Sequence, residues 1–410
     1  MAGICAALHV GKLAAALPVL RDALGVSVLQ AGFLLSLVQL AGMSFGVAVG
    51  LAADAFGLRR TMLTGLGILA AASALGGLAR HPADLLVLRA AEGFGFLLVT
   101  MPGPSLIRRL VSPARLDGSL GVWSTFMPIG TALALLAGPV VMAALGWTGL
   151  WELLAAVTVA AAILVAAVVP PDPRSHPSAA VRLRWTMRLR ETLASRGPWI
   201  VALCFAVYSA QWMSVIGFLP TIYSQAGLTA RWTALATASA AAVNIIGNVA
   251  AGRLLQRGVT PDRLLLAGFA AMGLGAWLAF GPLVSALGPA TAAAVRYGAV
   301  LMFSAVGGLI PATLFALAVR VAPNEGTVST TVGWMQQWSC FGQFVGPPLV
   351  AWAAHRTGGW EWTWLVTAAF ALSGATLAFG ARLRLRIAVL KGEERQMRPK
   401  IPHAVANLEK

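Results

Sequence analysis

Three charged side chains fall inside long apolar stretches, where a charge needs either water or a partner. Lys12 follows His9 by about one helical turn in the first stretch, and Arg89 and Glu92 lie three residues apart in a later one. A Lys in the middle of a membrane segment costs roughly 2.5–3.5 kcal/mol on insertion scales unless it is satisfied. An i,i+3 spacing brings a guanidinium and a carboxylate onto one helix face. These residues therefore predict anion binding or proton transfer within an apolar interior.

Each of these residues also has a purely structural interpretation. Lys12 could extend to a membrane interface, His9 could be a hydrogen-bonded helix residue, and Arg89 with Glu92 could be a neutralised pair that only tolerates burial. Lys12 lies some eight residues before Arg21, however, so its side chain would hardly reach the membrane surface at that end of the first stretch. Glu92 is the carboxylate that lies well inside an apolar stretch. We therefore predict that Lys12 lies in a cavity, with Glu92 as its partner from another helix when no ligand is bound.

The C-terminal half has neutral polar groups where the N-terminal half has charges. Amides in hydrocarbon must find hydrogen bonds, so each of these groups either joins helices together or faces a cavity. Gln336 and Gln337 point to adjacent helix faces, so the two need not both line one cavity. The group comprises Tyr208, Gln211, Trp212, Asn244, Asn248, Trp334, Gln336, Gln337, Trp338 and Gln343. Our candidate substrate-binding residues are Lys12, Arg89, Gln211, Trp212, Gln336 and Gln337.

The elements that must position these residues are membrane helices. Of 410 residues, 58% are hydrophobic and 11% are charged, and the mean hydropathy is +0.79. A soluble domain has about 25% charged residues, and a membrane helix needs about 20 apolar ones. We predict an all-α polytopic protein with twelve spans, at 1–20, 28–53, 60–79, 83–107, 118–145, 149–170, 199–223, 232–255, 263–284, 292–319, 327–354 and 362–382.

The positive charge of the chain indicates its orientation. The net charge is +16. With the N-terminus inside, 23 Lys and Arg fall on the cytoplasmic side, five fall outside and two lie within spans. This asymmetry predicts that both termini are cytoplasmic and explains the charge without nucleic acid. We expect a multi-pass protein of a bacterial inner (plasma) membrane, monomeric in the lipid bilayer, with a cytoplasmic linker loop at 171–198 and a basic cytoplasmic tail at 383–410.

The sequence contains no pattern typical of an enzyme or of a bound cofactor. Cys5, Cys204 and Cys340 lie in apolar runs without paired spacing, so we interpret them as packing residues. No nucleotide loop, metal cluster or nucleophile triad is present. We predict no enzyme activity, no cofactor, no metal and no ATP-driven pumping. The first apolar stretch starts almost at Met1, so we expect no cleavable signal sequence.

The two halves of the chain resemble each other. Gly118, Met127 and Gly138-Pro139 recur as Gly326, Met335 and Gly346-Pro347, all at an offset of 208 residues. Parallel repeats of six helices are one way in which transporters are built. We predict an N-terminal six-helix bundle at 1–170 and a C-terminal six-helix bundle at 199–382 around a central cavity.

A loop between two of the predicted spans carries the most recognisable motif. It reads Gly50-Leu51-Ala52-Ala53-Asp54-Ala55-Phe56-Gly57-Leu58-Arg59-Arg60. The spacing resembles the signature loop of the major facilitator superfamily, with Ala55 in place of the usual Arg. Arg89 with Gly93 resembles the second motif of the superfamily. Gly138-Pro139 is not followed by the glycine pair that is typical of its drug antiporters.

The resemblance implies secondary transport by alternating access between two bundles. It implies gating or coupling roles for Asp54, Arg59, Arg60 and Glu92, with protons as a candidate coupling ion. The first two spans are similar to the cyanate-transporter-like branch, in Gly11-Lys12-Leu13-Ala14-Ala15-Ala16-Leu17-Pro18 and Gln30-Ala31-Gly32-Phe33-Leu34-Leu35-Ser36. We expect the transporter to move a small organic or inorganic anion by symport or antiport. The alternative is a drug or amphipath efflux antiporter.

Overall fold

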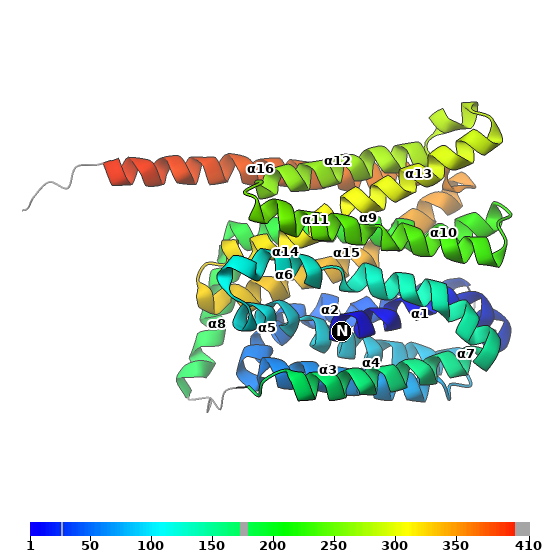
Figure 1. Cartoon of the computed structure of the whole chain (residues 1–410), viewed down its shortest axis with the longest axis horizontal. Helices are drawn as coiled ribbons and strands as arrows, with labels where there is room; N and C mark the ends of the chain where they lie inside the picture. The colour runs from blue at the N-terminus through cyan, green and yellow to red at the C-terminus, as the bar shows by residue number, and fades with distance from the viewer. Residues whose placement is uncertain (26–27, 173–178, 398–410) are drawn as a thin grey trace, which may run out of the picture.

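Long helices that run back and forth along one axis make up the chain in the computed structural model (Figure 1). The structure describes residues 1–25, 28–172 and 179–397, without the side chains at 18, 21, 28, 29, 31–33, 35, 54, 55, 179–184, 285 and 381–397. The described residues contain helices and no strand, as the sequence predicted.

The helices of the first half are α1 (Ala2–Leu24), α2 (Val28–Phe56), α3 (Leu58–Gly76), α4 (Pro82–Thr100), α5 (Pro102–Leu110), α6 (Pro113–Trp123) and α7 (Phe126–Val168). Those of the second half are α9 (Arg196–Gln225), α10 (Ala230–Ala242), α11 (Asn244–Gln256), α12 (Pro261–Phe280), α13 (Pro289–Gly307), α14 (Leu309–Val321), α15 (Val328–Thr357) and α16 (Thr363–Met397). Between them lies α8 (Ala179–Ala194), and three short 3₁₀ turns complete the set: η1 (Pro282–Ala286), η2 (Glu325–Thr327) and η3 (Trp360–Trp362).

The described helices account for twelve passes along the axis. Within the part of the chain that the structure describes, eight stretches are long and apolar enough to cross a membrane. One of them, Pro113–Val168, is 56 residues long and holds two passes, because Gly146 takes φ 71° and ψ 174° and reverses the chain. The three passes that complete the set are α1, α3 and α15.

Prolines interrupt three of the passes near their middle. The passes formed by α4 with α5, by α6 with the first part of α7, and by α13 with α14 are each broken close to a proline. These prolines are Pro102 and Pro104 in the first pass, Pro128 in the second and Pro311 in the third. Proline has no N–H to donate to the carbonyl four residues earlier, and its ring clashes with that carbonyl. The breaks therefore leave polar backbone in the middle of the molecule.

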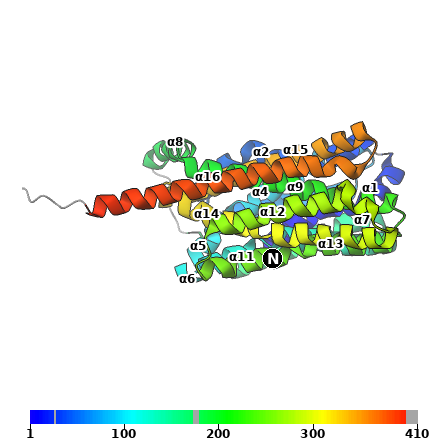
Figure 2. The same cartoon turned by 90° about the horizontal axis from the view of Figure 1, so that it is seen from above.

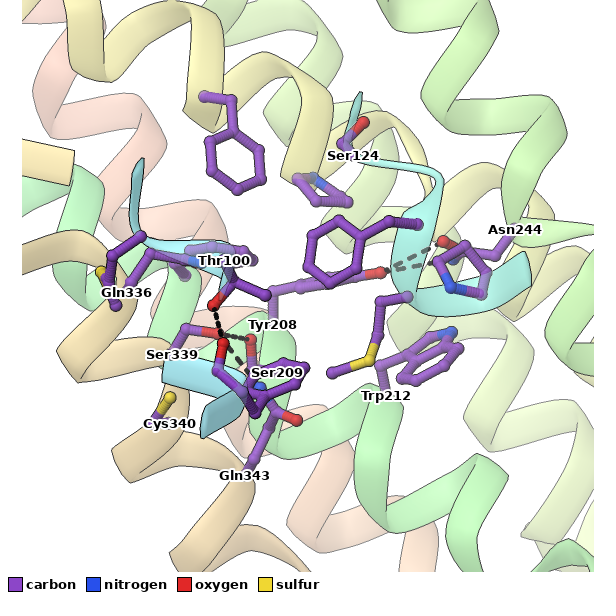
Figure 3. A pocket seen from close by; sticks show the side chains of 18 residues that line it. Thr100, Ser124, Tyr208, Ser209, Trp212, Asn244, Gln336, Ser339, Cys340 and Gln343 are labelled. Carbon is purple, nitrogen blue, oxygen red and sulfur yellow. Dashed lines mark hydrogen bonds between the residues drawn. The ribbon is translucent and has the colours of Figure 1, made fainter. Parts of the chain in front are cut away.

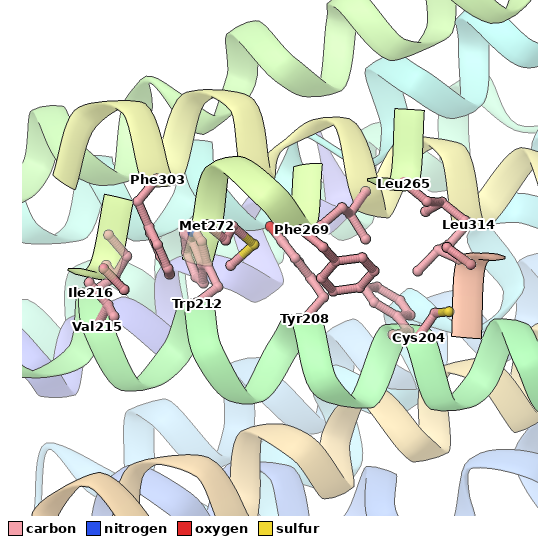
Figure 4. Packing of buried hydrophobic residues seen from close by; sticks show 14 of the residues in the cluster. Cys204, Tyr208, Trp212, Val215, Ile216, Leu265, Phe269, Met272, Phe303 and Leu314 are labelled. Carbon is pink, nitrogen blue, oxygen red and sulfur yellow. The ribbon is translucent and has the colours of Figure 1, made fainter. Parts of the chain in front are cut away.

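Each half has its own apolar interior. In the C-terminal half, α9, α12, α13 and α14 enclose Trp212, Phe269, Met272, Phe303 and Leu314, all of which are nearly inaccessible to solvent (Figure 4). In the N-terminal half the buried apolar side chains form two main clusters, one on either side of Lys12 along α1.

The two halves meet along two seams. On one side α2 packs against α15, and on the other α6 and α7 pack against α10, α11 and α14. The first seam is close because a Cβ at Gly50 would lie 3.2 Å from Gly333 Cα, and one at Gly46 would lie 2.7 Å from Gln337 Cβ. Small residues let membrane helices approach at this distance.

The segments predicted to lie outside the membrane are partly helical. The predicted linker loop at 171–198 contains the polar helix α8, which crosses the direction of the other helices in Figure 1. We call the end of the molecule where α8 lies the linker end. The last helix, α16, continues past 383 into the predicted tail and projects beyond the bundle at the linker end, as Figure 2 also shows.

Candidate functional site

A cluster of charged side chains lies in the interior of the N-terminal half. Lys12 on α1 forms an ion pair with Glu92 on α4, and its Nζ also donates to Ser73 Oγ on α3 at 3.0 Å. Arg89 Nη1 reaches the other carboxylate oxygen of Glu92 at 2.8 Å. Lys12 is 1% exposed, Glu92 2% and Arg89 4%, so water does not screen these contacts. The predicted partnership of Lys12 with Glu92 across two helices is present.

Local sequence explains how the charges reach one another. Arg89 and Glu92 share a face of α4 through their i,i+3 spacing. Gly93 lets α4 approach α2, because a Cβ there would lie 2.5 Å from the Val38 carbonyl oxygen. Arg89 also donates to backbone carbonyls, from Nε to Leu34 at 3.1 Å and from Nη1 to His9 at 2.5 Å. Arg89 thus fastens α1, α2 and α4 together.

Two cations share one carboxylate in this cluster. Lys12 and Arg89 are both paired to Glu92, and among the described side chains no second carboxylate contacts them. The Lys12 ammonium also lies over the Trp151 ring, 4.5 Å from its centroid, where the ring face attracts a cation. When His9 is neutral, the cluster holds one positive charge more than it can neutralise.

His9 connects this cluster to a neutral hydrogen-bonded chain. Its Nδ1 lies 3.3 Å from Lys12 Nζ, and its Nε2 lies 2.8 Å from Thr158 Oγ1 on α7. Cys5 Sγ donates to the same hydroxyl at 3.2 Å. The ring is completely buried and has a partner at each nitrogen. His9 is therefore a hydrogen-bonded helix residue that also touches the charged cluster.

A small cavity lies between the two halves (Figure 3). Its volume is about 50 Å³, which is room for a few water molecules, since one needs roughly 10–15 Å³ on this measure. The N-terminal half contributes Phe96, Thr100, Met101, Ser124, Phe126, Met127 and Pro128 to its wall. The C-terminal half contributes Phe205, Tyr208, Ser209, Trp212, Asn244, Pro311, Phe315, Gln336, Ser339, Cys340 and Gln343.

Neutral hydrogen bonds organise the C-terminal wall of this cavity. Ser209 Oγ and Ser339 Oγ are 2.7 Å apart, and Gln343 Nε2 donates to Ser339 Oγ at 3.3 Å. Gln39 Nε2 on α2 donates to Gln343 Oε1 at 2.9 Å and so joins the two halves beside the cavity. The Gln39 Oε1 atom is buried without a hydrogen-bond partner, which leaves one acceptor for a ligand donor or a water.

A second network surrounds Asn244, at the break between α10 and α11. Asn244 Nδ2 donates to the Ser304 carbonyl at 2.7 Å and to Tyr208 Oη at 3.3 Å. Asn248 Nδ2 donates to Asn244 Oδ1 at 2.8 Å, and Trp212 Nε1 donates to Ser304 Oγ at 3.3 Å. These contacts fix Tyr208, Trp212 and Asn244 in the cavity wall, where Figure 3 shows them.

The predicted substrate-binding residues fall into three groups. Trp212 and Gln336 line the cavity between the halves. Gln211 is buried and donates to the Val207 carbonyl at 3.0 Å, while Gln337 accepts the Val47 N–H at 2.9 Å, so both are engaged in helix contacts. Lys12 and Arg89 lie inside the N-terminal bundle and are not among the lining residues. The cavity residues missed by the sequence, chiefly Ser209, Ser339 and Thr100, carry no pattern that distinguishes them from other helix hydroxyls.

The predicted gating loop at 50–60 is held by a residue that the sequence did not single out. Asp172, just after α7, accepts the backbone N–H groups of Arg59 at 3.1 Å and Arg60 at 3.0 Å, at the start of α3. Arg109 adds an ion pair at 3.2 Å. Burial would raise the pKa of Asp172, but these donors outweigh it and hold the pKa below its usual range. The Asp54 side chain lies outside the described residues.

At the linker end, polar contacts join the two halves. Arg320 on α14 pairs with Asp117 on α6. Arg108 lies 3.8 Å from Glu325, and Ser105 Oγ lies 2.8 Å from Ser329 Oγ. The side chains of Arg320 and Glu325 are 46% and 96% exposed, so each ion pair contributes little to stability. Together with the α2–α15 seam, these contacts hold the two halves against each other at this end.

Comparison with known proteins identifies the family. The family model described as Major Facilitator Superfamily matches residues 1–347, which is most of the chain. The chain belongs to this superfamily. It is therefore a membrane transporter of the twelve-helix type and not an enzyme, as the sequence predicted.

Individual relatives are more distant. The chain is 28% identical over 314 residues to human Monocarboxylate transporter 11, across 70% of this chain and 61% of that protein. It is 28% identical over 130 residues to the Tetracenomycin C resistance and export protein of Streptomyces glaucescens, across 32% of this chain and 24% of that protein. The chain thus spans less than two thirds of the length of these relatives.

Among solved structures, the chain is similar to the E. coli fucose:proton symporter FucP. The TM-score is 0.69 at 16% identity, over 92% of this chain and 97% of that one. A second FucP structure, in the outward conformation, gives a TM-score of 0.67 at 17% identity with the same coverage. At this identity the similarity concerns the fold alone.

Proposed function

We propose that this member of the superfamily carries a small monoanion together with a proton by alternating access. The observation that supports the proposal is the unbalanced cluster of Lys12, Arg89 and Glu92. A buried excess positive charge in a membrane interior is costly. The cost falls if an anion is bound nearby, or if the cluster loses a proton when the anion leaves.

The position of the cluster makes this coupling direct. Glu92 lies four residues before Phe96 on α4, and Phe96 lines the cavity between the halves. Four residues are about one helical turn, or roughly 5–6 Å. This is the rise along α4 from Glu92 to a residue of the cavity wall, and a charge about one turn away acts on a ligand more strongly in a low-dielectric interior than in water. Lys12 and Arg89 thus attract an anion through the electrostatic field, while Trp212, Gln336 and their neighbours contact it.

This proposal narrows the predicted function in two respects. A similarity to Monocarboxylate transporter 11 supports a small organic acid as substrate. The resemblance of Gly11–Pro18 to the cyanate-transporter-like branch also supports a small anion. Monocarboxylates and cyanate-like anions each carry one negative charge. Asp54, Arg59 and Arg60 take the role of the gate at the linker end, which we place on the cytoplasmic side.

The remaining predictions on organisation belong to the same proposal. We place 1–170 and 199–382 as the two moving bundles, with 171–198 as the connection and 383–410 as a basic tail. Both termini are cytoplasmic on the positive-inside count. We also propose that the transporter acts as a monomer in a bacterial inner membrane.

Uptake into proteoliposomes tests the proposal. Purified protein is reconstituted, and uptake of radiolabelled lactate, fucose and ethidium is measured with and without an inward proton gradient. We expect lactate or another small monocarboxylate to accumulate only with the gradient. Accumulation of fucose alone would contradict an anionic substrate.

Export of an amphipathic compound is the second candidate. The observation that favours it is the aromatic wall of the cavity, formed by Phe96, Phe126, Phe205, Phe315 and Trp212, together with the similarity to an export protein. Ethidium transport that exchanges for protons and does not depend on Lys12 would establish this function instead.

A further inference from the structure

A second and larger cavity lies within the C-terminal half, at the end opposite the linker end. Its volume is about 460 Å³, against about 50 Å³ for the cavity between the halves. It is enclosed by the last turns of α9 and α12, by α13 and by the connection from α15 to α16. Pockets of about 300–1,000 Å³ are typical of sites for small organic molecules. Among the residues that the structure describes, those that line it all belong to the C-terminal half, and none of them lines the cavity between the halves.

The wall of this cavity is aromatic and carries one charge of each sign. Its aromatic side chains are Tyr223, Phe280, Trp360 and Trp362. Arg296 is the cation in the wall, and Glu361 is an exposed carboxylate. A single guanidinium is suited to a carboxylate, sulfonate or phosphate group, while the carboxylate disfavours a ligand with several negative charges.

Hydrogen bonding keeps part of this wall in place and leaves part of it unsatisfied. Trp360 Nε1 donates to Gln225 Oε1 at 2.8 Å, and the Trp360 ring lies 5.0 Å from that of Phe218. The connection turns at Gly358, where φ is 77°. The Tyr223 hydroxyl, in contrast, is buried without a hydrogen-bond partner. A buried hydroxyl without a partner is destabilising, and a ligand acceptor would remove this cost.

We propose that this cavity binds an amphipathic organic anion. Its apolar body packs against the aromatic side chains, its anionic head lies at Arg296, and the Tyr223 hydroxyl donates to it. The site lies among helix ends, where the aromatic belt of a membrane protein meets the headgroups. The same chemistry is offered by a bilayer lipid and by an aryl or alkyl anion from water. The site requires no transport activity and stands apart from the proposed function.

Quenching of tryptophan fluorescence tests the site, because Trp360 and Trp362 would contact the ligand. Purified protein in detergent is titrated with 9,10-dibromostearate, whose bromines quench tryptophan on contact. We expect saturable quenching that excess stearate reverses. The variant with Trp360→Phe and Trp362→Phe should lose most of the saturable part. Quenching that never saturates, or that survives in this variant, would overturn the proposal.

Two single changes and one control separate the ligand role from a structural one. Arg296→Gln should raise the half-saturating concentration about tenfold, because a charge-assisted hydrogen bond is lost. Tyr223→Phe should also raise it, while the thermal unfolding midpoint without ligand stays equal or rises. Arg231→Gln removes an exposed cation on α10 that does not line the cavity, and it should leave quenching unchanged. If Arg231→Gln and Arg296→Gln raise the half-saturating concentration equally, the protein attracts the anion only through its overall charge, and the proposal is overturned.

Further arms of the experiment identify the source of the ligand. If 2-naphthalenesulfonate competes with dibromostearate, the site accepts aryl anions from water. If dibrominated phosphatidylglycerol in nanodiscs quenches more than dibrominated phosphatidylcholine, and Arg296→Gln removes the difference, the site holds a bilayer lipid. If 2-naphthalenesulfonate does not compete and the two brominated lipids quench equally, the cavity does not select an anionic head at Arg296, and the proposal is wrong.

Discussion

The two halves of this transporter treat buried polarity in different ways. The N-terminal half buries ions, with Lys12, Arg89 and Glu92 joined in one cluster. The C-terminal half buries neutral amides, hydroxyls and indoles around Asn244 and Ser339. A neutral network keeps the same charge whether or not a ligand or a proton is present, whereas an ion cluster does not. In the proposed mechanism, the response to protons and anions therefore belongs to the first half, and the second half contributes most of the cavity wall.

The largest expected effect comes from removing the shared carboxylate. Glu92→Gln leaves Lys12 and Arg89 buried without a counter-charge, which costs about 3–5 kcal/mol when one partner of a buried pair is removed. We expect a large fall in the thermal unfolding midpoint in detergent and loss of uptake. An unchanged midpoint would show that water reaches the cluster.

Combining this change with Arg89→Gln sharpens the result. The double variant removes one charge of each sign, so its unfolding midpoint should lie above that of Glu92→Gln. If the pair serves only to neutralise burial, uptake should return as well. If Glu92 takes part in coupling, exchange of substrate can return while proton-driven uptake stays lost.

A change in the neutral network should lower stability by less and should leave the pH response alone. Asn244→Leu removes the donors to the Ser304 carbonyl and to Tyr208, as well as the acceptor of Asn248. Unmade hydrogen bonds of this kind cost about 1–3 kcal/mol. The unfolding midpoint should fall, while the pH profile of the remaining uptake keeps its wild-type form. A shifted pH profile would break the division of roles between the halves.

Asp172 offers a smaller effect with a defined pH dependence. Asp172→Asn weakens the cap on α3 and the contact with Arg109, and loss of a cap costs about 0.5–2 kcal/mol. The pKa of Asp172 is lowered in the folded protein. Its contribution is therefore complete above the unfolded pKa of about 3.9 and is lost as pH falls through the lower folded value. The gap between wild type and variant in unfolding midpoint should be constant from pH 7 to 5 and should narrow below about pH 4. A gap that widens on acidification would reverse the assigned sign.

The smallest expected change in stability is at the exposed ion pair between the halves. Arg320→Gln removes the contact with Asp117, and exposed pairs contribute about 0–1 kcal/mol. The same change can still shift the balance between transporter states, which differ by a few kcal/mol. We expect an unaltered unfolding midpoint together with altered accessibility of a cysteine placed at Ser105. Unchanged accessibility of this cysteine would show that Arg320 has no role in gating.

The sequence predicts the passes and the buried ions well because both depend on the cost of polarity in hydrocarbon. No carboxylate lies within a turn or two of Lys12 on its own helix, so a carboxylate from another helix was the expected partner, and Glu92 is that carboxylate. The orientation of Gln337 toward the Val47 N–H could not be foreseen, since adjacent helix positions point to different neighbours.

Contacts between distant loops were beyond the sequence as well. Asp172 accepts hydrogen bonds from the backbone N–H groups of Arg59 and Arg60. Every residue except proline has such a group, so the residue types do not predict this contact. Arg320 and Asp117 are 203 residues apart, and their pairing depends on how the halves dock. The large cavity near Trp360 likewise arises where the ends of α9, α12 and α15 meet α13 and a connection, and no single stretch of sequence encodes it.

The most direct test is the effect of Lys12 on proton-coupled uptake of an anion. Lys12→Gln removes the excess charge and leaves Arg89 paired with Glu92, so folding should be preserved. Lactate uptake into proteoliposomes is measured from pH 5 to 8, with the membrane potential clamped, for wild type, Lys12→Gln and Lys12→Arg. We expect electroneutral, proton-driven uptake in wild type, loss of uptake and of its pH dependence in Lys12→Gln, and partial retention in Lys12→Arg. If Lys12→Gln transports the anion with the pH profile of the wild type, the charged cluster is only structural and the coupling lies elsewhere.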